Sequence, residues 1–299
     1  MEGCLQCPRR CGADRETRMG FCRVPAAPMV VRAAPHYGEE PCISGTRGSG
    51  TVFFAGCNLR CVFCQNHAIS RGLAGRTVSV QQLRDIFLRL RDQGVHNINL
   101  VTPSHYAVSI AQALEGLDLG IPVVWNSSGY DSVETLRRME GLVQVYMPDF
   151  KYADPALAKR YSSAPDYPEV AAAAIAEMFR QVGPYELDDE GLLQKGVLVR
   201  HLILPEHPKN SRGVMDTLTR LLPKGSFLFS LMSQYTPMPG LEDFPELTKT
   251  VTPALSDFCY RYMLRCGIED GYYQDLAAAT DEMIPEFDLT GVDGNTFKN

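Results

Sequence analysis

The sequence predicts an α/β protein, a partial (βα)6 barrel preceded by a small cysteine-rich appendage. From residue 51 onward, short apolar runs rich in β-branched residues alternate with longer amphipathic stretches, a pattern typical of parallel strands joined by helices. The 299 residues, 45% of them hydrophobic, suffice for one large domain with or without an appendage. Eight of the ten cysteines lie within the first 64 positions, so cysteine chemistry is concentrated at the start of the chain.

We expect the chain to have three parts. Residues 1–50 combine early cysteines and prolines with a glycine-rich stretch at 45–50, and we interpret them as a metal- or cluster-binding segment with little core. Residues 51–270 form the barrel. Residues 271–299 form a C-terminal tail that can cover the barrel mouth.

Six segments have the apolar, β-branched composition of buried parallel strands. They cover residues 51–55, 97–101, 122–125, 143–147, 197–204 and 227–231. The first strand leads directly into a cysteine loop, and a helix is expected between it and the second strand.

Two helices have clear start signals. Ser79 can cap a helix over 80–93 with Gln82 three residues later, and Gly94 can end it. A second helix begins at Pro253 after Thr252 and continues to about residue 266. The alanine run at 171–174 is also predicted to be helical.

Charge and hydropathy exclude several classes of partner. The formal net charge is -6, from 29 Lys and Arg against 35 Asp and Glu, so there is no basic field for nucleic acid. No apolar run approaches the roughly 18 residues that span a bilayer, and the first residues lack the apolar stretch of a signal peptide. We therefore expect a cytoplasmic protein without a membrane partner, and we leave the oligomeric state open. Without an export signal, the cysteines indicate metal or cluster ligation rather than disulfides.

The loop after the first strand has a Cys57-x3-Cys61-x2-Cys64 spacing. Three thiolates at this spacing can hold three irons of a [4Fe-4S] cluster and leave the fourth open to a cofactor or substrate. Phe63 lies where an aromatic ring can shield the cluster from water. The alternatives are a partial zinc site completed by His67, or buried apolar thiols.

This motif, placed after the first strand of a (βα)6 pattern, resembles that of the radical S-adenosylmethionine superfamily. The resemblance implies that S-adenosylmethionine binds the open iron of a [4Fe-4S] cluster. It also implies an oxidoreductase that reductively cleaves this cofactor to methionine and a 5'-deoxyadenosyl radical. Since an open iron is oxygen-sensitive, we expect an anaerobic setting.

Over nearly its whole length the chain resembles the activating enzymes of glycyl radical enzymes, most closely homologues of the pyruvate formate-lyase activating enzyme. The resemblance is carried by residues 7–12 (Cys-Pro-Arg-Arg-Cys-Gly), 20–22 (Gly-Phe-Cys), 146–151 (Tyr-Met-Pro-Asp-Phe-Lys), 200–202 (Arg-His-Leu) and 230–235 (Ser-Leu-Met-Ser-Gln-Tyr), besides the cysteine loop. It implies a glycine of a partner protein as substrate and a flavodoxin- or ferredoxin-type electron donor.

The same resemblance suggests cofactor-binding residues at the predicted strand ends. Asp149 and Lys151 match an Asp-x-Lys at the cofactor site, with an ordinary strand-end salt bridge as the alternative. Asn126 and Ser128 lie in a stretch similar to the family's Asp-Thr-Asn-Gly. Here Asn126 replaces the aspartate, and an amide holds the family's monovalent cation less well.

A second departure follows the second strand. The usual Gly-Gly-Glu is replaced by Val-Thr-Pro-Ser-His at 101–105, where Thr102 or Ser104 can supply acceptors. Arg200 can contact a carboxylate or ribose, or else form a buried ion pair. Gln234, with Tyr235, follows another strand and is expected to face the cofactor.

The N-terminal cysteines form a further candidate site. Cys4, Cys7, Cys11 and Cys22 supply four thiolates, enough for zinc or a second iron-sulfur cluster, and the spacing does not decide between them. The neighbouring arginines form a basic patch that can dock an acidic redox donor, or a solvated face; they are Arg9, Arg10, Arg15 and Arg18. Cys259 and Cys266 are expected in the core.

Two rival functions remain open at this point. One is a radical enzyme that acts on a small molecule or another macromolecule. The other is a non-catalytic iron-sulfur or metal-binding protein that uses the barrel as a scaffold.

Overall fold

The computed structural model describes residues 3–71, 74–274, 276 and 285–292. Its ten strands are β1 (Met29–His36), β2 (Ser49–Phe54), β3 (Arg76–Thr77), β4 (Ile98–Val101), β5 (Val123–Ser127), β6 (Val145–Pro148), β7 (Glu186–Leu187), β8 (Leu193–Leu202), β9 (Leu228–Met232) and β10 (Gly271–Gln274). Its α-helices are α1 (Pro41–Ser44), α2 (His67–Arg71), α3 (Val80–Asp92), α4 (Ala107–Leu114), α5 (Val133–Arg138), α6 (Pro155–Ser162), α7 (Tyr167–Val182), α8 (Pro208–Leu221) and α9 (Pro253–Arg265). Two short 3-10 helices cover Ser104–Tyr106 and Pro245–Thr248.

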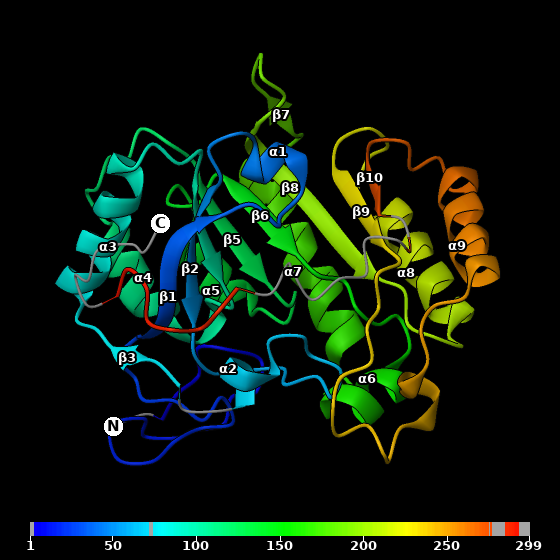
Figure 1. Cartoon of the computed structure of the whole chain (residues 1–299), viewed down its shortest axis with the longest axis horizontal. Helices are drawn as coiled ribbons and strands as arrows, with labels where there is room; N and C mark the ends of the chain where they lie inside the picture. Colours follow the sequence, from blue (N-terminus) through cyan, green and yellow to red (C-terminus); the bar gives the residue numbers. More distant parts are fainter. Residues whose placement is uncertain (1–2, 72–73, 275, 277–284, 293–299) are drawn as a thin grey trace.

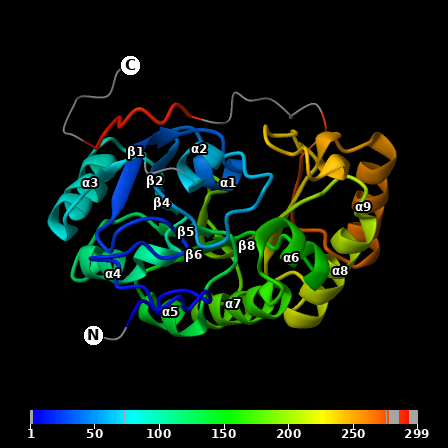
Figure 2. The same ribbon diagram turned by 90° about the horizontal axis from the view of Figure 1, so that it is seen from below.

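One curved sheet organises the molecule. Its strand order is β10-β9-β8-β6-β5-β4-β2-β1-β3, and β7 pairs with β8 off this path (Figure 1). The six predicted strands are confirmed as β2, β4, β5, β6, β8 and β9, each parallel to the next. Helices α3 to α9 form an arc outside the strands (Figure 2). This is the predicted α/β architecture with a parallel sheet curved toward a barrel.

The helix signals were interpreted correctly. At the start of α3, Ser79 and Gln82 form a reciprocal capping box, and Gly94 follows its end with a φ of +81°. The side chain of Thr252 accepts a hydrogen bond from the Leu255 amide at the start of α9. The alanine run lies inside α7.

Residues 29–50 are not an appendage with little core, and that part of the prediction was wrong. Strand β1 pairs antiparallel with β2 within the main sheet, and its Val30 and Val31 are fully buried. After β1 the chain turns into the barrel, where Cys42 and Ile43 of α1 are also buried. They pack in a separate interior core with residues of four strands: Val124, Val145, Leu198 and Leu228. Helix α1 therefore plugs one end of the barrel.

The sheet also extends beyond residue 270, because β10 pairs in parallel with β9. In the described part of the chain, the end strands β3 and β10 do not pair with each other, so the barrel stays open along one side. Residues 285–292 lie beside β1, as the red segment in Figure 2 shows. The Leu289 amide donates to the Val31 carbonyl at 3.0 Å, and the Ala33 amide donates to the Thr290 carbonyl at 2.9 Å. The rest of the predicted tail, apart from β10 and residue 276, lies outside the described residues.

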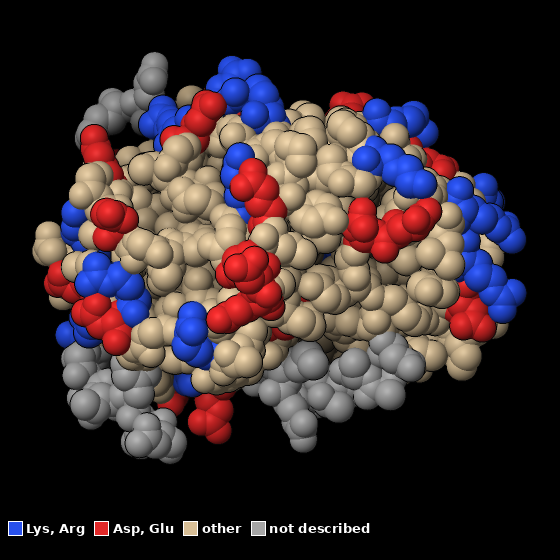
Figure 3. Space-filling model, turned by 90° about the horizontal axis from the view of Figure 1, so that it is seen from above, with Lys and Arg blue, Asp and Glu red and all other residues tan. Residues whose placement is uncertain are grey.

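One face of the molecule shows how its charges are distributed. On the face seen from above in Figure 3, acidic and basic side chains are interspersed among the coloured residues rather than gathered into one basic field. In the described portion, no helix has the length and apolar character needed to cross a bilayer.

Candidate functional site

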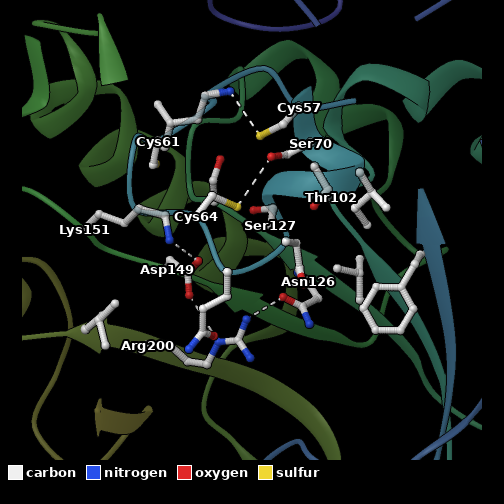
Figure 4. A pocket seen from close by; sticks show the side chains of 18 of the residues that line it. Cys57, Cys61, Cys64, Ser70, Thr102, Asn126, Ser127, Asp149, Lys151 and Arg200 are labelled. Atoms are coloured by element: carbon white, nitrogen blue, oxygen red, sulfur yellow. Dashed lines mark hydrogen bonds and ion pairs between the residues drawn. The ribbon is translucent and has the colours of Figure 1, made fainter. Parts of the chain in front are cut away.

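A cavity of about 240 Å³ opens at the carboxyl ends of the parallel strands, where ligands of such sheets bind. Its lining includes all ten residues predicted for the cluster loop and cofactor: Cys57, Cys61, Phe63, Cys64, Asn126, Ser128, Asp149, Lys151, Arg200 and Gln234. Figure 4 shows the three cysteines toward one end of this cavity and Asn126 and Arg200 toward the other. Residues separated by more than 170 positions in sequence thus share one site.

Each sulfur of the cysteine loop receives a hydrogen-bond donor. Cys57 Sγ accepts from the backbone amides of Leu59 at 3.3 Å and Arg60 at 3.4 Å. Ser162 Oγ donates to Cys61 Sγ at 3.1 Å, and Ser70 Oγ donates to Cys64 Sγ at 3.6 Å. Donors aimed at sulfur stabilise thiolates and tune iron-sulfur clusters.

The donor set of this loop fits a [4Fe-4S] cluster. Three soft sulfur ligands come from one loop that lines one cavity, and Cys57 and Cys61 are buried. In the free protein, burial and repulsion from Cys64 raise the pKa of the Cys57 thiol to about 12. Within the described residues, no three His, Cys, Asp or Glu side chains already surround a common point as a metal cage. The sulfurs are gathered by the loop rather than fixed in ligating geometry.

An aromatic wall lies behind the loop. Phe63 is 4% exposed and packs edge-on against Tyr152, Tyr161 and Tyr235, with ring centroids 6.2 to 6.3 Å apart. The Tyr235 hydroxyl donates to the Leu247 carbonyl, so this predicted residue belongs to the wall and does not line the cavity. The wall limits the access of water to the sulfur side of the site.

Charged side chains form a ladder across the cavity. Lys151 Nζ lies 2.6 Å from Asp149 Oδ2, and Arg200 Nε lies 3.2 Å from Asp149 Oδ1. Arg200 also donates to Asn126 Oδ1 at 2.6 Å (Figure 4). Burial alone would raise the pKa of Asp149, but Lys151 and Arg200 hold it below its usual value. The ion pairs that were the alternatives to cofactor binding for Asp149, Lys151 and Arg200 are therefore present. The same three side chains also line the cavity.

Sequence reasoning missed the acidic end of this ladder. Glu39, from the loop between β1 and α1, accepts from Arg200 Nη1 at 2.9 Å, from Asn99 Nδ2 at 3.0 Å and from Asn126 Nδ2 at 3.2 Å. The adjacent Glu40 also lines the cavity. The only signal in the sequence was the absence of the family's Gly-Gly-Glu after the second strand. Without that glutamate, the site lacks a carboxylate that the resemblance would imply. Of the two residues suggested in its place, Thr102 lines the cavity and Ser104 does not.

The N-terminal cysteine segment packs directly on the cluster loop. Arg9 donates to the carbonyls of Asn58 at 2.9 Å and Ser162 at 2.7 Å, and its guanidinium lies 3.9 Å from the Phe21 ring centroid. Cys7 and Cys22 are buried, Cys4 is half-buried and Cys11 is exposed.

The basic patch differs from the predicted one. Arg15 is 5% exposed and donates to the carbonyls of Val24, Pro25 and His105, so it is not part of a surface patch. Arg10 and Arg18 are exposed. Of the two C-terminal cysteines, Cys259 is buried as predicted, while Cys266 is partly buried.

Known proteins are similar in sequence to this chain. A model of the Radical SAM superfamily matches residues 51–183. The Uncharacterized protein MJ0674 of Methanocaldococcus jannaschii is 30% identical over 261 residues, which cover 84% of this chain and 71% of that protein.

Solved structures give a likeness of fold alone. The crystal structure of Streptococcus suis SuiB bound to S-adenosylmethionine matches with a TM-score of 0.51 at 13% identity, over 76% of this chain and 50% of SuiB. SuiB bound to its precursor peptide SuiA matches with a TM-score of 0.50 at 14% identity, over 77% of this chain and 49% of SuiB. The chain thus spans about half the length of SuiB.

Proposed function

The chain belongs to the radical S-adenosylmethionine superfamily, and from that premise we propose that it cleaves S-adenosylmethionine reductively to start a hydrogen abstraction. The observation that carries the proposal is the gathering of Cys57, Cys61 and Cys64 with the Asp149–Lys151–Arg200 ladder around one cavity. A [4Fe-4S] cluster, when bound, supplies the electron that splits the sulfonium into methionine and a 5'-deoxyadenosyl radical.

The chain's own residues have distinct parts in this proposal. Cys57, Cys61 and Cys64 hold the cluster. Lys151 and Arg200 offer positive charge to the cofactor's carboxylate, while Asp149 keeps both side chains in place. Asn126, Ser128 and Gln234 offer hydrogen bonds to its polar groups, as the resemblance implies. The aromatic wall around Phe63 excludes water.

The test is anaerobic. The wild type and a Cys57→Ala/Cys61→Ala/Cys64→Ala variant are reconstituted with iron and sulfide, reduced with dithionite, given S-adenosylmethionine and assayed for 5'-deoxyadenosine. We expect the product from the wild type alone. A wild type that holds a full, reducible cluster and S-adenosylmethionine yet yields none would contradict the proposal and favour the non-catalytic alternative.

For the substrate, we propose a glycine of a partner enzyme, which is what the resemblance to glycyl radical activating enzymes supports. The expected readout is a glycyl radical signal in electron paramagnetic resonance of the partner. A small molecule or a peptide is the second candidate, since SuiB has been solved with its precursor peptide. Deoxyadenosine formation that depends on such a compound, with no protein radical, would favour it.

We also propose that Cys4, Cys7, Cys11 and Cys22 hold zinc or a second iron-sulfur cluster. Support comes from their packing against the cluster loop through Arg9. Metal retained by the Cys57→Ala/Cys61→Ala/Cys64→Ala variant and lost when these four are replaced would identify the site. The exposed Arg10 and Arg18 offer a docking face to an acidic flavodoxin- or ferredoxin-type donor, whose binding should weaken with added salt.

A further inference from the structure

The end of the cavity away from the cysteines is closed by an acidic floor, defined here as Glu39 and Glu40. Glu40 is 2% exposed and is the residue that precedes α1, but its side chain makes no capping hydrogen bond. Neither oxygen of its carboxylate has a hydrogen-bond partner in the described structure. A buried carboxylate without donors is costly and calls for a partner that arrives from outside.

The charges around the cavity do not balance. Three carboxylates line it, those of Glu39, Glu40 and Asp149, against two cations, Lys151 and Arg200. Each cation already has a close carboxylate partner other than Glu40, because Lys151 lies 2.6 Å from Asp149 and Arg200 lies 2.9 Å from Glu39. Glu40 lies 3.9 Å from the Arg200 nitrogen that already serves Glu39. Glu40 is therefore the one of these carboxyl groups without a close counter-ion. Burial raises its pKa, so a cation that arrives with a ligand is needed to hold it in the charged form.

The floor lies beyond the place proposed for the cofactor. From the cysteines, the ladder passes through Lys151, Asp149 and Arg200 before it reaches Glu39 and Glu40. Beneath the floor, Cys42 and Ile43 of α1 fill the barrel interior with apolar side chains. A ligand that shares the cavity with S-adenosylmethionine thus meets carboxylate oxygens at its far end.

We propose that the acidic floor binds a primary ammonium group, either of a small-molecule substrate or of a lysine side chain on the partner protein, with Glu40 as the residue that selects for it. The ammonium supplies a positive charge beside Glu40. It also supplies up to three hydrogen-bond donors for the carboxylate oxygens that have no partner. The unpartnered carbonyl oxygens of Gln234 and Gln274 also line the cavity and suit a ligand rich in donors. This inference rests on the proposed function, because that function places the cofactor at the cysteine end.

The test measures binding to reconstituted protein loaded with S-adenosylmethionine, by calorimetry. The probes are cadaverine as a free amine and acetyl-lysine-amide as a protein-like amine, each against its neutral counterpart, 1-pentanol and acetyl-norleucine-amide. We expect one amine to bind at least tenfold more tightly than its neutral counterpart. A preference for cadaverine would indicate a small-molecule ligand, and a preference for acetyl-lysine-amide would indicate a protein side chain. Glu40→Gln should abolish that preference, whereas Glu190→Gln, in the exposed β7–β8 hairpin, should leave it unchanged.

Three results would overturn the inference. The first is that amines bind no better than the neutral probes, and the second is that Glu40→Gln keeps the preference. A loss of tenfold or more in affinity for S-adenosylmethionine in Glu40→Gln would instead assign the floor to the cofactor. Glu40→Met repeats the test if the glutamine variant does not fold. If the wild type prefers amines but makes no 5'-deoxyadenosine, the proposed function fails while the floor's selectivity stands.

Discussion

At the scale of single residues, Gly56 joins the two cysteine-bearing segments. It lies two residues after the end of β2 and has a φ of +78°, and a Cβ there would lie 2.6 Å from the Cys22 carbonyl oxygen. Only glycine avoids both the backbone strain and the contact. The N-terminal cysteine segment can therefore pack directly against the residue that precedes Cys57.

Gly56→Ala tests this contact. Gly94→Ala is a matched control, because Gly94 has a φ of +81° and open space around its added methyl group. We expect Gly94→Ala to lower the free energy of unfolding by about 1 kcal/mol through strain alone. Gly56→Ala should lower the free energy of unfolding by about 3 kcal/mol. The variant should also lose iron faster to a chelator, since Cys22 must move. Equal effects of the two changes, measured by thermal unfolding and iron release, would show that the contact is unimportant.

At the scale of elements, α1 shows how a very short helix determines the shape of the site. Only four residues long, it fills the barrel end with Cys42 and Ile43 and places Glu39 and Glu40 above them. Ile43 is completely buried. The plug therefore holds the floor of the cavity at a fixed depth.

Ile43→Ala should lower the free energy of unfolding by about 3 kcal/mol, because it leaves a void that the surrounding strands cannot fill. Leu264→Ala, at a side chain of α9 that is 44% exposed, should change the free energy of unfolding by less than about 0.5 kcal/mol. Chemical unfolding of both variants checks the difference. If the two were equally stable, α1 would not be acting as a plug.

The elements that the sequence predicts differ physically from those it does not. The six central strands are largely buried on both faces, so each contains a short run of apolar residues that stands out in the sequence. Strand β1 was missed because Pro35 and the glycines after it resemble a loop, although Pro35 lies where β1 has only β2 as a neighbour. Helix α1 is too short to show periodicity. Strand β10, four residues at the sheet edge, gives an equally weak signal.

At the scale of the whole molecule, the site residues also divide into those that the sequence predicts and those that it does not. The cysteines, Asp149, Lys151 and Arg200 follow or end strands, so parallel topology alone predicts that they meet. Glu39 and Glu40 enter from the opposite end of the barrel, where only the three-dimensional path of the chain brings them to Arg200. A sequence pattern carries no information about that path.

Two buried histidines predict how the stability of the whole fold depends on pH. Burial lowers the pKa of His105 to about 3 and that of His201 to about 4. His201 Nδ1 lies 2.7 Å from the Phe150 carbonyl oxygen and Nε2 lies 2.9 Å from Ser211 Oγ, an arrangement that suits the neutral ring. Unfolding frees both rings to take up protons near pH 6.5.

Their contribution to stability is therefore complete above about pH 6.5 and is lost as pH falls toward 4. Each histidine should lower the free energy of unfolding by about 1 kcal/mol between pH 7 and pH 5.5. His201→Gln should remove its share of this slope even though the variant is less stable at pH 7. Thermal unfolding at both pH values checks this, and an unchanged slope in the variant would show that His201 is not the group responsible.

The C-terminal segment 285–292 borders the cavity near the open side of the barrel. Residues 285–292 lie along β1, and the Phe287 ring packs on Phe53 with centroids 5.5 Å apart. Phe53 and Pro285 both line the cavity, so this segment covers one edge of the site. Phe287→Ala should expose that edge and speed the loss of the cluster's visible absorbance in air several-fold, because oxygen and water gain access. Asp288→Asn is the control: its ion pair with Arg32 is only partly buried, with side chains 22% and 44% exposed, and contributes little. If Phe287→Ala and Asp288→Asn lost absorbance at the same rate, other parts of the chain would be protecting the site.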